Sequence, residues 1–173
     1  MAEICVRPVD PTTPEVAELL AALDVYQTAL YPPASAHLLP AAALAASDAA
    51  FLGVFADERL VGCGGYINRA GEYGELKRMF VCPEARGLGI GRRLLAALEG
   101  HAAAAGLTVL RLETGVSQPE AIRLYERAGY ERRGPFGEYA ADPLSVFMEK
   151  RLAADPLATP ARGLDTVRLN RRT

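Results

Sequence analysis

Residues 83–93 read PEARGLGIGRR, and this glycine-rich run follows an apolar stretch at residues 75–82. Beyond it, Leu94, Leu95 and Leu98 recur at helical spacing, and Gly106 is typical of a helix end. The pattern predicts a strand, a glycine loop and a helix of about four turns. Backbone N–H groups at the start of such a helix lack internal partners and lie at the positive end of its dipole, where proteins commonly bind phosphate.

Two standard phosphate motifs do not match this loop. A P-loop needs Gly-Lys followed by Ser or Thr, and the loop contains no such run. The dinucleotide fingerprint GxGxxG fails because Arg92 or Leu94 stands where its last glycine belongs. The loop instead contains the pattern R-x-x-G-x-G, formed by Arg86, Gly89 and Gly91.

A second motif follows downstream. Gln118, Ala121, Tyr125 and the pair Gly129-Tyr130 form the pattern Q-x-x-A-x-x-x-Y-x-x-x-G-Y. Upstream of the loop, residues 75–81 read ELKRMFV. Over about residues 50 to 150, these three segments together make the sequence resemble the GNAT superfamily of N-acetyltransferases, whose pyrophosphate loop is written (Q/R)-x-x-G-x-(G/A).

The resemblance implies an α/β fold of the α+β type. Its central sheet is mixed and mostly antiparallel, with about six to seven strands splayed at the centre and about four flanking helices. The residue patterns agree, because short connections predict an antiparallel meander and a helical crossover predicts one parallel pair after the glycine loop. Strands are expected at 4–9, 51–56, 60–68, 75–82, 108–113, 130–133 and 145–151, with further helices at 15–31, 38–46 and 118–128.

Length and composition set the class of protein. The 173 residues fit one compact domain, expected at 1–151, followed by a flexible or surface-draped tail at 152–173. Half of the residues are hydrophobic and the net charge is −2, so no basic field favours nucleic acid or a membrane surface. The start of the chain reads as no signal peptide and no run reaches membrane-spanning length, which predicts a cytoplasmic protein.

The resemblance implies acetyl-CoA as co-substrate and no metal. Beyond the glycine loop the central strand and its parallel neighbour would splay apart, so that pantetheine amides can pair with the strand's free backbone groups. Loop N–H groups would hold the diphosphate. The implied cofactor-binding residues are Phe80, Val81, Arg86, Gly87, Leu88, Gly89, Ile90, Gly91, Arg92, Gln118, Ala121 and Tyr125.

Acetyl transfer to an amine needs a group that accepts a proton, because an alkylammonium with a pKa of about 10.4 is almost fully protonated at neutral pH. Glu75 matches the family's carboxylate at the start of the central strand and is the candidate base. Alternation places Lys77 on its face, and this cation would weaken it as a base, so a structural carboxylate is the alternative. Glu113 is the second candidate. Tyr125 would protonate the leaving thiolate, or else serve as a core aromatic.

The acceptor is less well defined by the sequence. Acidic groups in the loop at 134–143 favour a cationic amine, whereas a cation in the pocket would suit an amino-acid-like acceptor with a carboxylate. We expect a primary amine of a small molecule; a protein lysine or N-terminus, and a non-catalytic acyl-CoA sensor, remain alternatives, and a homodimer is left open. The candidate substrate residues are His37, Lys77, Arg78, Glu113, Glu138 and Tyr139.

Cys5, Cys63 and Cys82 are widely spaced and have no CxxC partner or histidine cluster. All three are predicted to be reduced, buried side chains. Because none has an activating neighbour in sequence, direct attack of the amine on the thioester is expected in place of an acetyl-cysteine intermediate.

Overall fold

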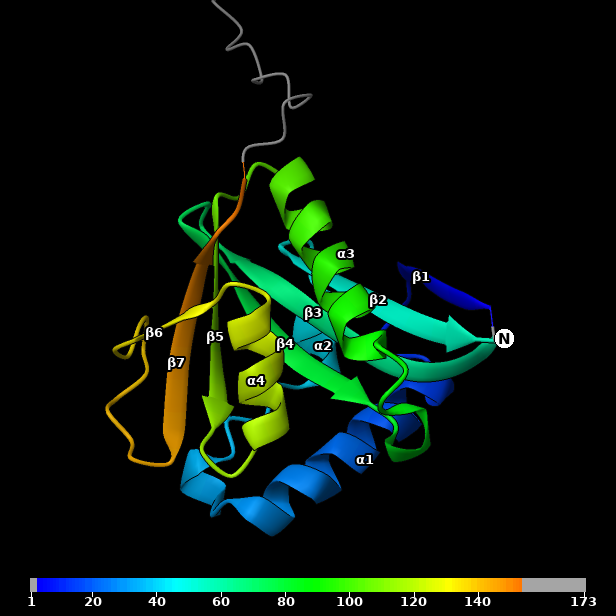
Figure 1. Ribbon diagram of the computed structural model, residues 1–173, viewed down its shortest axis with the longest axis horizontal. Coiled ribbons are helices and arrows are strands. Elements are labelled where there is room, and N and C mark those ends of the chain that lie inside the picture. Colours follow the sequence, from blue (N-terminus) through cyan, green and yellow to red (C-terminus); the bar gives the residue numbers. More distant parts are fainter. Residues whose placement is uncertain (1–2, 154–173) are drawn as a thin grey trace, which may run out of the picture.

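The computed structural model describes residues 3–153, which build one seven-stranded sheet with helices packed against it (Figure 1). The strand order is β1-β2-β3-β4-β5-β7-β6, and all neighbours are antiparallel except β4 and β5, which are parallel. The predicted meander and the predicted parallel pair are therefore confirmed. The strands are β1 (Ile4–Pro8), β2 (Ala49–Ala56), β3 (Arg59–Arg69), β4 (Tyr73–Val81), β5 (Val109–Gly115), β6 (Glu131–Arg133) and β7 (Ser145–Arg151).

Four α-helices accompany the sheet, and short 3-10 turns at Pro33–Ser35 and Pro83–Ala85 lie in two of the loops. Prolines occupy the first turns of α1 and α4, as their missing N–H groups allow. Helix α2 is shorter than the residues 38–46 predicted, because Pro40 delays its start and alanines supply little packing. The helices are α1 (Pro14–Leu30), α2 (Ala41–Leu44), α3 (Ile90–Ala104) and α4 (Pro119–Arg127).

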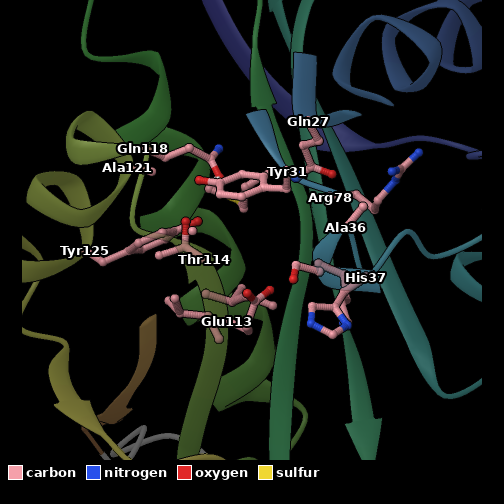
Figure 2. A pocket seen from close by; sticks show the side chains of 16 residues that line it. Gln27, Tyr31, Ala36, His37, Arg78, Glu113, Thr114, Gln118, Ala121 and Tyr125 are labelled. Carbon is pink, nitrogen blue, oxygen red and sulfur yellow. Dashed lines mark hydrogen bonds between the residues drawn. The ribbon is translucent and has the colours of Figure 1, made fainter. Parts of the chain in front are cut away.

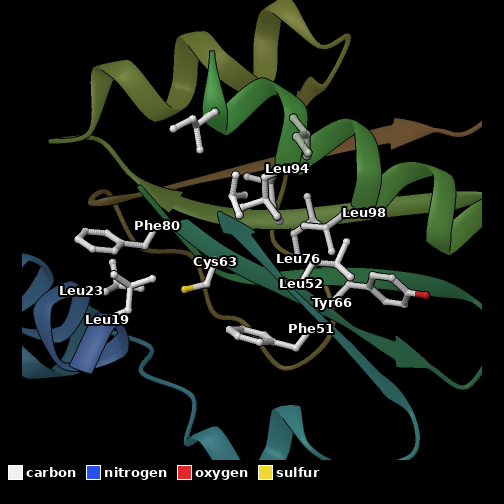
Figure 3. Close-up of a cluster of buried hydrophobic side chains, with 14 of the residues drawn as sticks. Leu19, Leu23, Phe51, Leu52, Cys63, Tyr66, Leu76, Phe80, Leu94 and Leu98 are labelled. Atoms are coloured by element: carbon white, nitrogen blue, oxygen red, sulfur yellow. The ribbon is translucent and has the colours of Figure 1, made fainter. Parts of the chain in front are cut away.

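The core lies on both faces of the sheet (Figure 3). Leu94 and Leu98 of α3 pack on one face, and Leu19 and Leu23 of α1 pack on the other. All four are nearly inaccessible to solvent, which removes the apolar stripe of each helix from water and fixes both helices on the central strands. Near the end of α1, the Tyr26 ring lies 5.7 Å from the guanidinium of Arg86 in the glycine loop that follows β4.

A bulge interrupts β4. Lys77 pairs with Gly65 and Phe80 pairs with Cys63, so that Arg78 and Met79 together oppose the single residue between them on β3. Arg78 takes a φ of 59°, a conformation that side-chain-bearing residues rarely adopt. Strict alternation, which puts Lys77 on the face of Glu75 and would put Met79 there too, therefore fails beyond Lys77, because the extra residue turns the strand.

The pairing of β4 with β5 stops early. It includes only Gly74 with Leu110 and Glu75 with Arg111, although both strands continue for several residues. Beyond this point the two strands diverge toward α1 and the N-termini of α3 and α4 (Figure 1). The central splay expected from the sequence is thus present, and it opens the sheet where the glycine loop begins.

Three further expectations concern the surface and the ends of the chain. Cys63 and Cys82 are buried, but Cys5 is exposed, since it lies on the outer face of the edge strand β1. Most of the predicted tail, residues 154–173, lies outside the described residues. Within residues 3–153, no helix combines the length and the apolar character needed to cross a bilayer.

Candidate active site

The glycine loop presents its backbone to solvent. Gly87 and Gly89 have φ values of 82° and 73°, which only glycine adopts without strain, and residues 86–89 are exposed. Gly89 caps α3 with no side-chain hydrogen bond, so the first N–H groups of that helix remain free. Arg92 and Arg93 are exposed in the first turn and add positive charge. The loop therefore has the properties of an anion site.

A pocket lies between the diverging strands (Figure 2). One wall is the end of β4 and the other is the end of β5, with α4 behind and the segment after α1 across the mouth. Its lining residues are Gln27, Tyr31, Ser35, Ala36, His37, Leu76, Lys77, Arg78, Met79, Leu112, Glu113, Thr114, Gly115, Gln118, Ala121 and Tyr125.

Glu113 is the carboxylate of this pocket. Burial raises the pKa of its side chain, and the hydrogen bond from Ser145 together with the nearby His37 and Lys77 only partly offsets that effect. The Ser145 hydroxyl donates to Glu113 Oε1 at 2.7 Å and fixes its orientation. A carboxylate with a raised pKa in a pocket is well suited to accept a proton near neutral pH.

Glu75 has a different environment. Its side chain is only 3% exposed and pairs with Arg69 at 2.6 Å and with Lys77 at 2.9 Å, while the Tyr139 hydroxyl donates to it at 2.7 Å. Burial opposes its ionisation, but the Lys77 charge and these hydrogen bonds outweigh burial and hold the pKa of Glu75 below its usual range. Glu75 is outside the lining of the pocket. The geometry therefore favours the second candidate base, Glu113, over Glu75.

This network predicts that Glu75 acts on stability. Replacing Glu75 with glutamine leaves the largely buried Lys77 ammonium without its carboxylate, which should cost about 3 kcal/mol and lower Tm by roughly 6–12 °C. Because the folded pKa of Glu75 is lowered, its contribution is complete above the ordinary value of 4.5 and is lost as pH falls through the folded pKa. Thermal unfolding of both proteins from pH 7 downward should show their Tm values converging; a constant difference would contradict this role.

Tyr125 lies on α4 and points toward Thr114 across the pocket (Figure 2). Its ring packs edge-on against Tyr130 with centroids 5.7 Å apart. Burial, helped by the negative charge of Glu113, raises the pKa of its hydroxyl, so the phenol keeps its proton. The two sequence-based interpretations are thus compatible: the ring belongs to the core and the side chain still lines the pocket.

Sequence reasoning missed Tyr31 and Gly115, which hold the end of α1 against the start of α4 beside the pocket. The Tyr31 hydroxyl accepts a hydrogen bond from the Ser117 N–H at 3.1 Å and lies 3.3 Å from Gln118 Oε1, which joins α1 to the start of α4. A Cβ at Gly115 would overlap that hydroxyl, so a glycine is needed there. These contacts connect residues more than 80 positions apart, beyond the range of any local pattern.

A family model described as the acetyltransferase (GNAT) family matches residues 16–130, which is more than half of the chain. The chain belongs to the acetyltransferase (GNAT) family. It is therefore an N-acetyltransferase of a family that uses acetyl-CoA.

Two curated relatives support the assignment. The chain is 49% identical over 153 residues to the "IAA acetyltransferase" of Azospirillum brasilense, with 88% of this chain and 100% of that protein covered. It is also 33% identical over 127 residues to the "Uncharacterized N-acetyltransferase YsnE" of Bacillus subtilis, covering 72% of this chain and 84% of that protein.

Solved structures agree with the fold. A Klebsiella pneumoniae structure assigned to the acyl-CoA N-acyltransferases superposes with a TM-score of 0.75 at 39% identity, covering 87% of this chain and 98% of that one. The PaiA N-acetyltransferase of Thermoplasma acidophilum, solved with coenzyme A, gives a TM-score of 0.68 at 21% identity, covering 86% and 99%. The second likeness concerns the fold alone.

In this GNAT chain the expected cofactor residues fall into three places. Those from Arg86 to Arg92 form the loop and the first turn of α3, whereas Gln118, Ala121 and Tyr125 line the pocket. The Phe80 side chain packs in the core, and the Val81 carbonyl accepts a hydrogen bond from Arg86 Nε at 3.2 Å. The backbone of this segment faces the opening that β5 leaves.

The expected substrate residues are only partly brought together. His37, Lys77, Arg78 and Glu113 line the pocket. Tyr139 stands behind them, hydrogen-bonded to Lys77 and with its ring edge-on to His37 at 5.1 Å. Glu138 is exposed and outside the lining, because the turn at 136–139 directs Tyr139 inward in its place.

Proposed function

We propose that this GNAT enzyme transfers the acetyl group of acetyl-CoA to the primary amine of a small molecule by direct attack in a ternary complex. The observation that carries the proposal is the position of Glu113 and Tyr125 in one pocket at the fork between β4 and β5. The free N–H groups after Gly87 would hold the diphosphate at the same end of the sheet. Pantetheine would then extend along β4 toward the pocket.

The proposed step moves one acetyl group and one proton. The amine nitrogen attacks the thioester carbonyl carbon while Glu113 accepts a proton from that nitrogen. The C–S bond of the tetrahedral intermediate then breaks, and the Tyr125 hydroxyl gives its proton to the departing thiolate of coenzyme A. The proton held by Glu113 then returns to the Tyr125 oxygen, so that overall one proton moves from nitrogen to sulfur and both side chains regain their starting states. The products are the acetylated amine and coenzyme A.

Direct attack is favoured by the state of the cysteines. Burial raises the pKa of the Cys63 thiol to about 12, and burial also raises the pKa of Cys82, so neither is a ready thiolate. Neither residue lines the pocket. Intact-mass analysis after incubation with acetyl-CoA alone should therefore show unmodified protein, whereas a stable covalent acetyl group on a cysteine would support a two-step route.

A small acceptor is supported by a contact across the mouth of the pocket. The Ser35 hydroxyl donates to Asp142 Oδ2 at 2.6 Å and connects the segment after α1 to the loop before β7. A protein acceptor would instead need an open groove between these two segments. The full-length relative at 49% identity, named IAA acetyltransferase, also supports a small-molecule acceptor.

The activity is tested by thiol release. Purified protein with acetyl-CoA and a panel of primary amines should release coenzyme A, with at least one small amine turned over far faster than lysine-containing peptides. Micromolar binding of coenzyme A with no release for any amine would support the sensor alternative. A clear preference for peptides would support a protein acceptor.

Tyr125→Phe tests the proposed acid. Removing the hydroxyl keeps the ring packed against Tyr130 but withdraws the proton for the thiolate, so kcat should fall by about 100-fold. The dissociation constant of coenzyme A should stay within about twofold, because binding depends on the loop. Turnover equal to the wild type would remove Tyr125 from this role.

A further inference from the structure

We propose that Lys77 binds a carboxylate of the acceptor, and that the substrate class is a primary amine that also carries a carboxylate, such as an amino acid. This inference rests on the proposed function and names the substrate class of the same pocket. It is based on which charged side chains around the fork of β4 and β5 already have partners of opposite charge.

The negative charges near the pocket are nearly all engaged. Glu75 is bound by Arg69, Lys77 and Tyr139, and Asp142 accepts from Ser35 and from the Leu144 N–H at 2.8 Å. Within the described part of the chain, Glu113 is the one acidic residue in the lining. An acceptor with only an ammonium group would therefore find one carboxylate, which the reaction itself uses.

The positive charges are not balanced in the same way. Arg69 and Lys77 share the single carboxylate of Glu75, so these three side chains carry one excess positive charge, which the nearby carboxylate of Glu113 partly offsets. The Lys77 side chain is only 13% exposed, so water screens that charge weakly. A buried excess cation beside a pocket is stabilised when an anion enters the pocket.

The hydrogen bonds of Lys77 leave one donor free for a ligand. An ammonium group has three N–H donors, and within residues 3–153 its acceptors are Glu75 Oε1 and the Tyr139 hydroxyl. Both contacts hold the ammonium in place, Lys77 is among the residues that line the pocket, and its charge acts on Glu113. His37, edge-on to Tyr139, lies beside it and offers a second polar group.

Arg78 is the other cation of the lining, but it is directed elsewhere. Its guanidinium forms an ion pair with Asp24 of α1, and Figure 2 shows the side chain extending away from Glu113 and Tyr125. Lys77 on β4 and Glu113 on β5 instead stand on opposite walls of one opening. An acceptor can then place its amine at Glu113 and its carboxylate at Lys77.

The test compares amino acids with the amines that lack their carboxylate: phenylalanine with phenethylamine, leucine with isoamylamine, and alanine with ethylamine. For at least one pair, wild-type kcat/KM should favour the amino acid by about 10- to 100-fold, the worth of a charge-assisted hydrogen bond. Lys77→Met should bring this ratio close to one, and Lys77→Arg should retain part of it. Lys150→Met, which removes a lysine paired with Glu99 away from the pocket, should leave the ratio unchanged.

The ratio between paired substrates cancels any general loss of folded enzyme. Wild-type enzyme that prefers the amines without carboxylates in every pair, or Lys77→Met enzyme that keeps the wild-type ratio, would overturn the inference while leaving the proposed function intact. Absence of coenzyme A release with every amine would overturn the proposed function, and the inference with it.

Discussion

Glu113→Gln is expected to lower kcat by about 100- to 10,000-fold, the usual contribution of a positioned general base. Glutamine keeps the size of the side chain and can still accept the hydrogen bond from Ser145, but it cannot take the proton of the amine. Affinity for coenzyme A should change little. Glu131→Gln is the matched control, because it makes the same change at an exposed residue of β6, and it should retain wild-type kcat.

The pH dependence of kcat provides a second test of Glu113 as the base. The base must be ionised, so kcat falls on the acid side of the pH profile as pH drops through the pKa of Glu113. Because burial raises that pKa, this acid limb of the profile should lie above the ordinary glutamate value of 4.5. In Glu113→Gln the limb should disappear from the residual activity. If Glu113→Gln keeps both its rate and its acid limb while Glu75→Gln loses them, Glu75 is the base.

Gly89→Asp is expected to weaken coenzyme A binding by about 100-fold, equivalent to about 2.8 kcal/mol. Aspartate adopts the left-handed conformation more often than most residues that carry a side chain, so its strain at this position should be modest, and a Cβ there meets no atom within 4 Å. The fold should therefore survive. Its carboxylate would place a negative charge beside the free N–H groups of α3, where the diphosphate would bind. Calorimetric titration with coenzyme A measures the change directly.

Gly106→Asp is the matched control for this substitution. Gly106 also has a positive φ, 85°, with open space around a Cβ, but it follows the C-terminal end of α3. It should bind coenzyme A with wild-type affinity. Equal affinities in Gly89→Asp and Gly106→Asp would show that the loop does not hold the diphosphate.

Local signals predicted most of the fold correctly. Proline in a first helical turn, glycine after a helix and period-two apolar runs each act over a few residues, so the order of elements and the parallel pair of β4 with β5 were accessible from the sequence. The bulge at Arg78 was not, because it depends on how β4 is matched to β3. That bulge brings Leu76, Lys77, Arg78 and Met79 all into the lining of one pocket.

The choice between the two candidate bases shows where sequence reasoning stops. Lys77 next to Glu75 could be read from alternation, but the contributions of Arg69 across the hairpin and of Tyr139, 64 positions away, could not. The environment of Glu113 likewise depends on Ser145, 32 positions away on β7. The difference in pKa between the two carboxylates therefore follows from tertiary contacts, which no local motif encodes.

A crystal structure of the enzyme with coenzyme A tests the central claim most directly. The account predicts the diphosphate on the N–H groups of residues 87–92 and the sulfur between the side chains of Tyr125 and Glu113, at the fork of β4 and β5. Coenzyme A bound away from the glycine loop, or with its sulfur outside this fork, would contradict it.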